Sequence, residues 1–206
     1  MNEGPPDADR RRRKWRERWS QAEFSRDWLS EEIDPTVAAA ADSRFFPAGA
    51  RLLDIGCGGG HIAAALAGRG YRVTGIDFAE PAIEQAIARH GASGNPQFSV
   101  ADFCVGGSVS GPFEAALDRG CFHSLPESSI PAYVENLAEV LVPGGAFLLL
   151  HKPGKKSAGG IDPAGTLPDR IAASFAPAFD IVETGRADFG GETGMAPGFA
   201  FKMRRS

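Results

Sequence analysis

The stretch LLDIGCGGGHIAAAL, residues 52–66, joins an apolar run to an alanine-rich segment through a corner with four glycines in five residues. Glycine loses more conformational freedom on folding than any other residue, so a glycine cluster in ordered structure needs a reason. Glycine lets the backbone approach a ligand closely, and the N-terminus of a helix favours negative charge. A buried strand, a glycine turn and a helix therefore predict a ligand site at this corner.

The alternation of short apolar runs and helical segments continues along the chain. Apolar runs predict strands at 51–55, 71–77, 96–100, 113–118 and 146–151. Helical spacing of apolar residues predicts helices at 61–70, 81–90 and 128–141, the last ended by Pro143–Gly145. Strands that alternate with helices indicate a parallel sheet covered on both faces. Two later runs, 179–189 and 195–205, predict an antiparallel hairpin at one edge, and the connection at 151–168 is a long loop.

Composition limits the class of protein. The chain has 206 residues, 43% hydrophobic and 23% charged, which is ordinary for a soluble globular domain. Its net charge of −4 gives no general attraction to nucleic acid or to anionic membranes. The apolar runs are too short to span a membrane and the N-terminus lacks a signal-peptide core, so we expect a cytoplasmic protein. The scattered Cys57, Cys104 and Cys121 fit neither disulfides nor zinc, and no metal is expected.

The N-terminal region precedes this pattern. Residues 1–9 are expected to be a disordered tail, residues 10–49 a helical lid, and residues 50–206 the main domain. Trp15 and Trp19 are four residues apart, so they share one face of a helix. That face either packs on the domain, with the arginines of the basic run 10–14 in water, or closes over a ligand.

A dinucleotide does not suit the glycine corner. The dinucleotide pattern G-x-G-x-x-G would need a third glycine at residue 61, where the chain has His61. The pattern present is D-x-G-x-G-x-G over residues 54–60. A carboxylate before the glycines would repel a pyrophosphate and suits a cationic ligand. Asp77 ends the second apolar run, where a ribose-binding acid is expected in such folds, and Asp102 follows the third.

Four stretches in order, LLDIGCGGG, VTGIDFAEPAIEQA, ADF and LVPGGAFLLL, resemble the successive motifs of class I S-adenosylmethionine-dependent methyltransferases. The resemblance covers residues 50–151. It implies a Rossmann-like α/β fold, with a mostly parallel seven-stranded sheet, helices on both faces and a C-terminal antiparallel hairpin. It also implies S-adenosylmethionine as cofactor and S-adenosylhomocysteine as product.

The resemblance implies roles for the cofactor-binding residues. The loop with Asp54, Gly56, Gly58 and Gly60 would hold the amino acid part of the cofactor, and Asp77 would bind both ribose hydroxyls. Asp102 would meet the adenine amino group, with Phe103 against the ring. The further candidate contacts are Trp19, Trp28, Cys57, His61, Phe78 and Asp118, with Phe24 as an alternative aromatic cover.

The acceptor site is expected at residues 116–126, ALDRGCFHSLP. With the W-x-x-x-W lead-in and the proline-containing loop after LLLHKP, its DRG resembles the thiopurine and thiol methyltransferases. Arg119 could hold a thiol acceptor as the thiolate. For a hydroxyl acceptor, His123 is the first candidate base and His151 the second. Asp118 could orient either acceptor. Alternatively, Asp118 and Arg119 pair with each other or cap the backbone, and His123 is a hydrogen-bonded loop histidine. The stretch CFHSLP departs from the family's more apolar one, which leaves the acceptor open.

The main functional hypothesis is methyl transfer to a small-molecule acceptor, with a thiol sulfur as first guess and oxygen or nitrogen as the alternative. A nicotinamide oxidoreductase would need the missing G-x-G-x-x-G. An RNA methyltransferase using the run 10–14, or a binding module without catalysis, has less support from the sequence. We expect no membrane partner and a monomer or homodimer.

Overall fold

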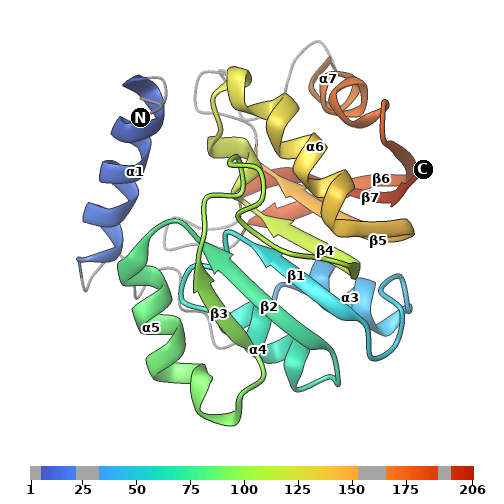
Figure 1. Cartoon of the computed structure of the whole chain (residues 1–206). Coiled ribbons are helices and arrows are strands. Elements are labelled where there is room, and N and C mark those ends of the chain that lie inside the picture. Colours follow the sequence, from blue (N-terminus) through green and yellow to red (C-terminus); the bar gives the residue numbers. More distant parts are fainter. Residues whose placement is uncertain (1–5, 22–32, 153–165, 190–195) are drawn as a thin grey trace.

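The computed structural model describes residues 6–21, 33–152, 166–189 and 196–206 (Figure 1). The strands are β1 Arg51–Ile55, β2 Arg72–Asp77, β3 Gln97–Val100, β4 Phe113–Arg119, β5 Leu141–His151, β6 Phe179–Phe189 and β7 Ala196–Arg205. The α-helices are α1 Pro6–Trp19, α3 Pro35–Asp42, α4 His61–Ala67, α5 Glu80–His90, α6 Ile130–Val140 and α7 Thr166–Phe175. No helix within the described ranges has both the length and the hydropathy to cross a membrane.

The strands form one seven-stranded sheet in the order β3-β2-β1-β4-β5-β7-β6. The first five strands in the chain run parallel, and β7 lies antiparallel between β5 and β6. This order reverses direction between β1 and β4, which is where open α/β sheets bind ligands. The predicted fold class, with its C-terminal antiparallel hairpin, is confirmed.

Helices cover both faces of the sheet (Figure 1). On one face, α3 and α4 bury apolar side chains such as Val37 and Leu66 against Leu52 of β1. On the other face, α6 and α7 pack Tyr133 and Phe175 into a second cluster with neighbouring strands. Because consecutive β1 residues point to opposite faces, one strand serves both cores, and its end is fixed from both sides.

The N-terminal region differs from the prediction in two ways. Helix α1 begins at Pro6, inside the expected tail, because proline has no N–H to lose in a first turn and a φ suited to a helix. Within the expected lid, α3 is part of the core, with Val37 and Ala40 fully buried. Residues 1–5 lie outside the described part of the chain.

The end of α6 is also earlier than expected. The helix stops at Val140, and Leu141 already pairs with Phe113 as the first residue of β5. The register between β4 and β5 then shifts, so that Ala146 pairs with Ala115. Residues 142–145 form the irregular stretch between these pairs, so Pro143–Gly145 shape a bulge rather than end the helix.

Candidate cofactor and acceptor site

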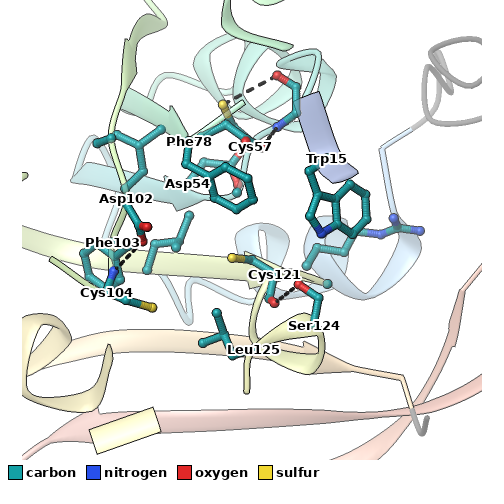
Figure 2. Close-up of a pocket in the computed structure, with 18 of the residues that line it drawn as sticks. Trp15, Asp54, Cys57, Phe78, Asp102, Phe103, Cys104, Cys121, Ser124 and Leu125 are labelled. Atoms are coloured by element: carbon teal, nitrogen blue, oxygen red, sulfur yellow. Dashed lines mark hydrogen bonds between the residues drawn. The ribbon is translucent and has the colours of Figure 1, made fainter. Parts of the chain in front are cut away.

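A pocket lies at the carboxyl ends of the first four strands, with α1 along one side (Figure 2). Its lining includes Asp54 and the glycine loop, Asp77 at the end of β2 with Phe78 after it, Asp102 and Phe103 after β3, and Arg119 at the end of β4. Trp15 and Trp19 line it from α1, so the predicted shared face of these two residues points at the pocket. Strand ends far apart in sequence therefore meet at one site.

The glycines of the loop are required by the protein's own packing. Gly56, Gly58 and Gly60 have φ values of +72°, +53° and +80°, which side-chain-bearing residues rarely adopt. A Cβ atom would lie 2.6 Å from Trp19 at Gly58 and 2.6 Å from Phe98 at Gly60. At Gly56 it would lie 2.6 Å from the Cβ of Cys121. Packing of protein side chains thus requires glycine at these positions, and Gly56 and Gly58 also line the pocket, so the prediction of a ligand-binding loop stays a prediction.

Asp54 carries the strongest indication of a cationic ligand. Its residue is 2% exposed, and its Oδ2 has no hydrogen-bond partner in the described structure. Burial, with the nearby charges of Asp118 and Asp77, raises the pKa of Asp54 to about 7. A cation at the pocket would satisfy this oxygen and favour the ionised form. The cationic amino acid part of S-adenosylmethionine fits this requirement.

Asp77 joins β2 to the glycine loop. Its Oδ2 accepts a hydrogen bond from the backbone N–H of Gly58 at 3.1 Å, and its Oδ1 accepts one from Ala79 at 2.8 Å. Burial raises the pKa of Asp77 to about 6. Each carboxylate oxygen can accept a second hydrogen bond, so the fixed carboxylate could also receive a pair of ribose hydroxyls.

Asp102 is held by α1. Its Oδ2 accepts hydrogen bonds from Arg12 Nε at 3.1 Å and Arg12 Nη2 at 2.8 Å, and Arg11 Nη2 lies 3.5 Å away. Its Oδ1 accepts a hydrogen bond from the backbone N–H of Cys104 at 3.0 Å, which leaves that oxygen one further acceptor position. Arg11 and Arg12 therefore contact the domain, whereas Arg13 is exposed, so the interpretation that placed the arginines of the run in water holds for only part of it.

Three of the remaining candidate cofactor contacts line the pocket, and two lie outside the described residues. Cys57 and His61 line the pocket, and burial raises the pKa of the Cys57 thiol well above its usual value. Burial also lowers the pKa of His61 to about 4, which keeps its imidazole neutral. Phe78 projects into the pocket between Asp54 and Trp15 (Figure 2). Trp28 and Phe24 lie outside the described residues.

Asp118 lies behind the pocket. It is fully buried, and its Oδ1 accepts a hydrogen bond from the backbone N–H of Cys121 at 2.8 Å. Its Oδ2 accepts hydrogen bonds from the N–H of Phe122 at 2.9 Å and from Tyr133 Oη at 2.7 Å. Asp118 is not part of the pocket lining, so we correct its expected contacts with acceptor and cofactor. These bonds give it the role of holding the loop after β4.

Arg119 does line the pocket, with a partner that the sequence analysis missed. Its Nε donates to Asp34 Oδ2 at 2.6 Å, and its guanidinium lies 5.3 Å from the ring centre of Phe189. Asp118 and Arg119 therefore do not pair with each other. Asp34 also caps α3, since its Oδ1 accepts a hydrogen bond from the N–H of Thr36. The signal was Asp-Pro-Thr before an alanine run, a common helix start.

His123 lies beside the pocket rather than in its lining. Its Nδ1 accepts a hydrogen bond from the backbone N–H of Lys152 at 3.4 Å. Its ring centre is 5.9 Å from that of His151 and 6.0 Å from that of Phe189. Burial lowers the pKa of His123 and of His151 to about 4. This position resembles the hydrogen-bonded loop histidine more than a base facing the acceptor.

Sequence and structure comparisons place these features in a known context. The profile of a family described as "Methyltransferase domain" matches residues 52–145. A thiopurine S-methyltransferase of Legionella pneumophila (strain Paris) is 30% identical over 178 residues, covering 78% of this chain and 79% of the relative.

Two solved structures share the fold. One comes from work on the conversion of a disulfide bond into a thioacetal group during echinomycin biosynthesis. It has a TM-score of 0.73 and 26% identity, and the match covers 87% of this chain and 85% of that one. The second, magnesium protoporphyrin IX methyltransferase from Synechocystis PCC 6803 with bound S-adenosylhomocysteine, has a TM-score of 0.71 at 17% identity. That match covers 95% of this chain and 100% of the other.

Proposed function

The chain belongs to the class I S-adenosylmethionine-dependent methyltransferases, and on that premise we propose that it methylates the sulfur of a small-molecule thiol. When bound, the cofactor supplies a methyl group activated on a sulfonium centre. The protein has to align an acceptor with that methyl group and to provide the acceptor in a nucleophilic form.

Two comparisons support sulfur as the acceptor atom. The Legionella relative is named as a thiopurine S-methyltransferase. The echinomycin structure concerns the conversion of a disulfide into a thioacetal, which is also chemistry at sulfur. The match to each extends over more than three quarters of this chain, so it includes the elements around the end of β4.

One charged group of the pocket, the guanidinium of Arg119, supports the proposal. Arg119 lines the pocket at the end of β4, beside Gly120 and Cys121. A nearby guanidinium lowers the pKa of a thiol, which is about 8.5 in water, and so favours the thiolate. The imidazoles of His61 and His123 have pKa values of about 4, which makes them too weakly basic for efficient deprotonation of a hydroxyl. A thiol acceptor needs no strong base.

An oxygen or nitrogen acceptor is the second candidate, and one observation favours it. His61 lines the pocket, and its Nδ1 is buried without a hydrogen-bond partner in the described structure. That nitrogen could accept a hydrogen bond from a hydroxyl or an amine. RNA methylation through the run 10–14 has less support, because Arg11 and Arg12 are turned toward Asp102.

Matched acceptors test the proposal. Labelled S-adenosylmethionine would be offered with thiophenol, phenol and aniline, which share a ring and differ in the acceptor atom. We expect methylation of thiophenol to be fastest. In Arg119→Gln, we expect the thiophenol rate to fall more at pH 6 than at pH 9, with cofactor affinity retained. Faster methylation of phenol or aniline than of thiophenol would refute the thiol proposal.

A further inference from the structure

The basic run at residues 10–14 divides between the pocket and solvent. Arg11 lines the pocket, and its side chain is only 9% exposed. Arg13 and Lys14 of the same helix are exposed. Arg11 is therefore part of the pocket. Neither the net charge of the chain nor its motifs had predicted a pocket residue in this run.

Arg11 contacts Phe78, Asp102 and the thiol of Cys104, and these neighbours leave its buried Nε without a partner among the described residues. Its guanidinium carbon lies 4.9 Å from the ring centre of Phe78, and its Nη2 lies 3.5 Å from Asp102 Oδ2. Its Nε is buried, with no hydrogen-bond partner in the described structure. Leaving a buried donor unsatisfied is costly, especially on a charged group. A ligand that brings an acceptor atom to this point would remove the cost.

We propose that Arg11 binds the cofactor, its Nε–H donating a hydrogen bond to the adenosine part of S-adenosylmethionine. The inference rests on the family's cofactor occupying this pocket. Phe78 and Asp102 follow β2 and β3, on the side of the pocket away from the end of β4. Adenosine offers ring nitrogens and ribose oxygens as neutral acceptors. The cationic end of the cofactor suits Asp54 instead, since a guanidinium would repel it.

Arg12 positions Arg11 by fixing α1. Its Nε and Nη2 both donate to Asp102 Oδ2. Two further contacts hold the helix against α5: Arg16 pairs with Glu80 at 3.2 Å, and Gln85 Nε2 donates to the carbonyl of Trp19 at 2.9 Å. Cofactor binding and docking of α1 are therefore linked, because the Arg11 donor is in place only when the helix is docked.

Calorimetric titration of the full chain with S-adenosylhomocysteine and with adenosine tests the proposal. In Arg11→Gln, we expect affinity for both probes to fall about tenfold, as for loss of one charge-assisted hydrogen bond. The matched control Arg13→Gln changes an exposed arginine of the same helix and should alter neither affinity by more than about twofold. Tryptophan fluorescence of the ligand-free variants, to which Trp15 and Trp19 of α1 contribute two of the chain's three indoles, should be that of the wild type.

Each other outcome overturns the proposal. Unchanged affinity for both probes would remove Arg11 from the cofactor site. A loss for S-adenosylhomocysteine without a loss for adenosine would assign Arg11 to the other half of the ligand. Arg12→Gln, which weakens the docking of α1, serves as a second comparison. If Arg11→Gln alters the fluorescence and lowers the affinity only as much as Arg12→Gln does, Arg11 acts only through the docking of α1. Failure of the cofactor assignment itself is distinguishable, because the wild-type chain would then not bind S-adenosylhomocysteine.

Discussion

Arg119 Nε donates a hydrogen bond to Asp34 Oδ2 at 2.6 Å, which joins the pocket end of β4 to the first turn of α3. The Asp34 side chain is 2% exposed and that of Arg119 14%. One carboxylate thus caps a helix and fixes the Arg119 guanidinium at the edge of the pocket. The position of Arg119 depends on a residue 85 positions earlier in the chain.

Two variants at Asp34 separate the cap from the ion pair. Asp34→Ala removes both and is expected to lower the free energy of unfolding by about 3 kcal/mol, because it leaves Arg119 without its partner. Asp34→Asn retains a capping side chain and should recover about 1 kcal/mol of that loss. Urea unfolding measures the difference. Equal losses in the two variants would mean that the cap contributes nothing.

Gly58 lies under the indole of Trp19, and this contact makes a second prediction. Gly58→Ala should lower the free energy of unfolding by about 1–3 kcal/mol more than Gly70→Ala. Both glycines have positive φ values, +53° and +90°, so backbone strain is common to both variants. A Cβ atom added at Gly58 would clash with the indole of Trp19, whereas a Cβ atom added at Gly70 would meet nothing within 4 Å. Equal destabilisation would show that Trp19 does not hold the loop.

Buried carboxyls predict how stability depends on pH. Burial raises the pKa of Asp54 from 3.8 to about 7, so the folded chain binds a proton there that the unfolded chain has released. The contribution of Asp54 to the free energy of unfolding is fully present below pH 3.8, and it is lost as the pH rises through about 7. Asp54→Asn should therefore gain stability relative to the wild type as the pH rises over that range.

Chemical unfolding of the ligand-free proteins between pH 4 and pH 8 measures this difference. Glu84→Gln removes an exposed carboxyl of α5 and serves as the control, with a constant difference from the wild type expected. A constant difference for Asp54→Asn as well would mean that Asp54 titrates normally in the folded chain.

His123 makes a prediction about mechanism. His123→Asn keeps an oxygen able to accept the N–H of Lys152, and it removes the imidazole. With a thiol acceptor, we expect kcat to fall by less than about tenfold, since removal of a general base typically costs 10²–10⁴-fold. Steady-state kinetics measure this loss in kcat and so distinguish a positioning role of His123 from a role as general base. Titration with the cofactor verifies that the variant still binds it. A loss of about a thousandfold would make His123 the base and favour an oxygen acceptor.

The sequence predicted what local patterns encode. The strand, glycine turn and helix at residues 51–67 follow from one continuous stretch. Asp77 and Asp102 were found because parallel strands end at the same edge of the sheet. Helix α7 could also have been found, since Leu167, Ile171 and Phe175 recur every four residues on one face.

Contacts between distant segments could not be predicted in this way. Arg12 and Asp102 are 90 residues apart, and no periodicity or motif links α1 to the end of β3. The same holds for Asp118, whose place within the predicted acceptor stretch, residues 116–126, suggested catalysis. Only the folded chain brings Tyr133 and two backbone N–H groups to its carboxylate. Short motifs thus predicted where the site lies, whereas the roles of several of its residues depend on long-range contacts that only the structure shows.

The most direct test of the account is calorimetric titration of S-adenosylmethionine, S-adenosylhomocysteine and NADH into the wild type, Asp77→Ala and the exposed-site control Glu84→Ala. We predict that the wild type and the control bind the first two ligands and not NADH. Asp77→Ala should bind both about a hundredfold more weakly, as for loss of two hydrogen bonds. Binding of NADH alone, or S-adenosylmethionine binding that Asp77→Ala leaves unchanged, would contradict the assignment of this pocket to the methyl donor.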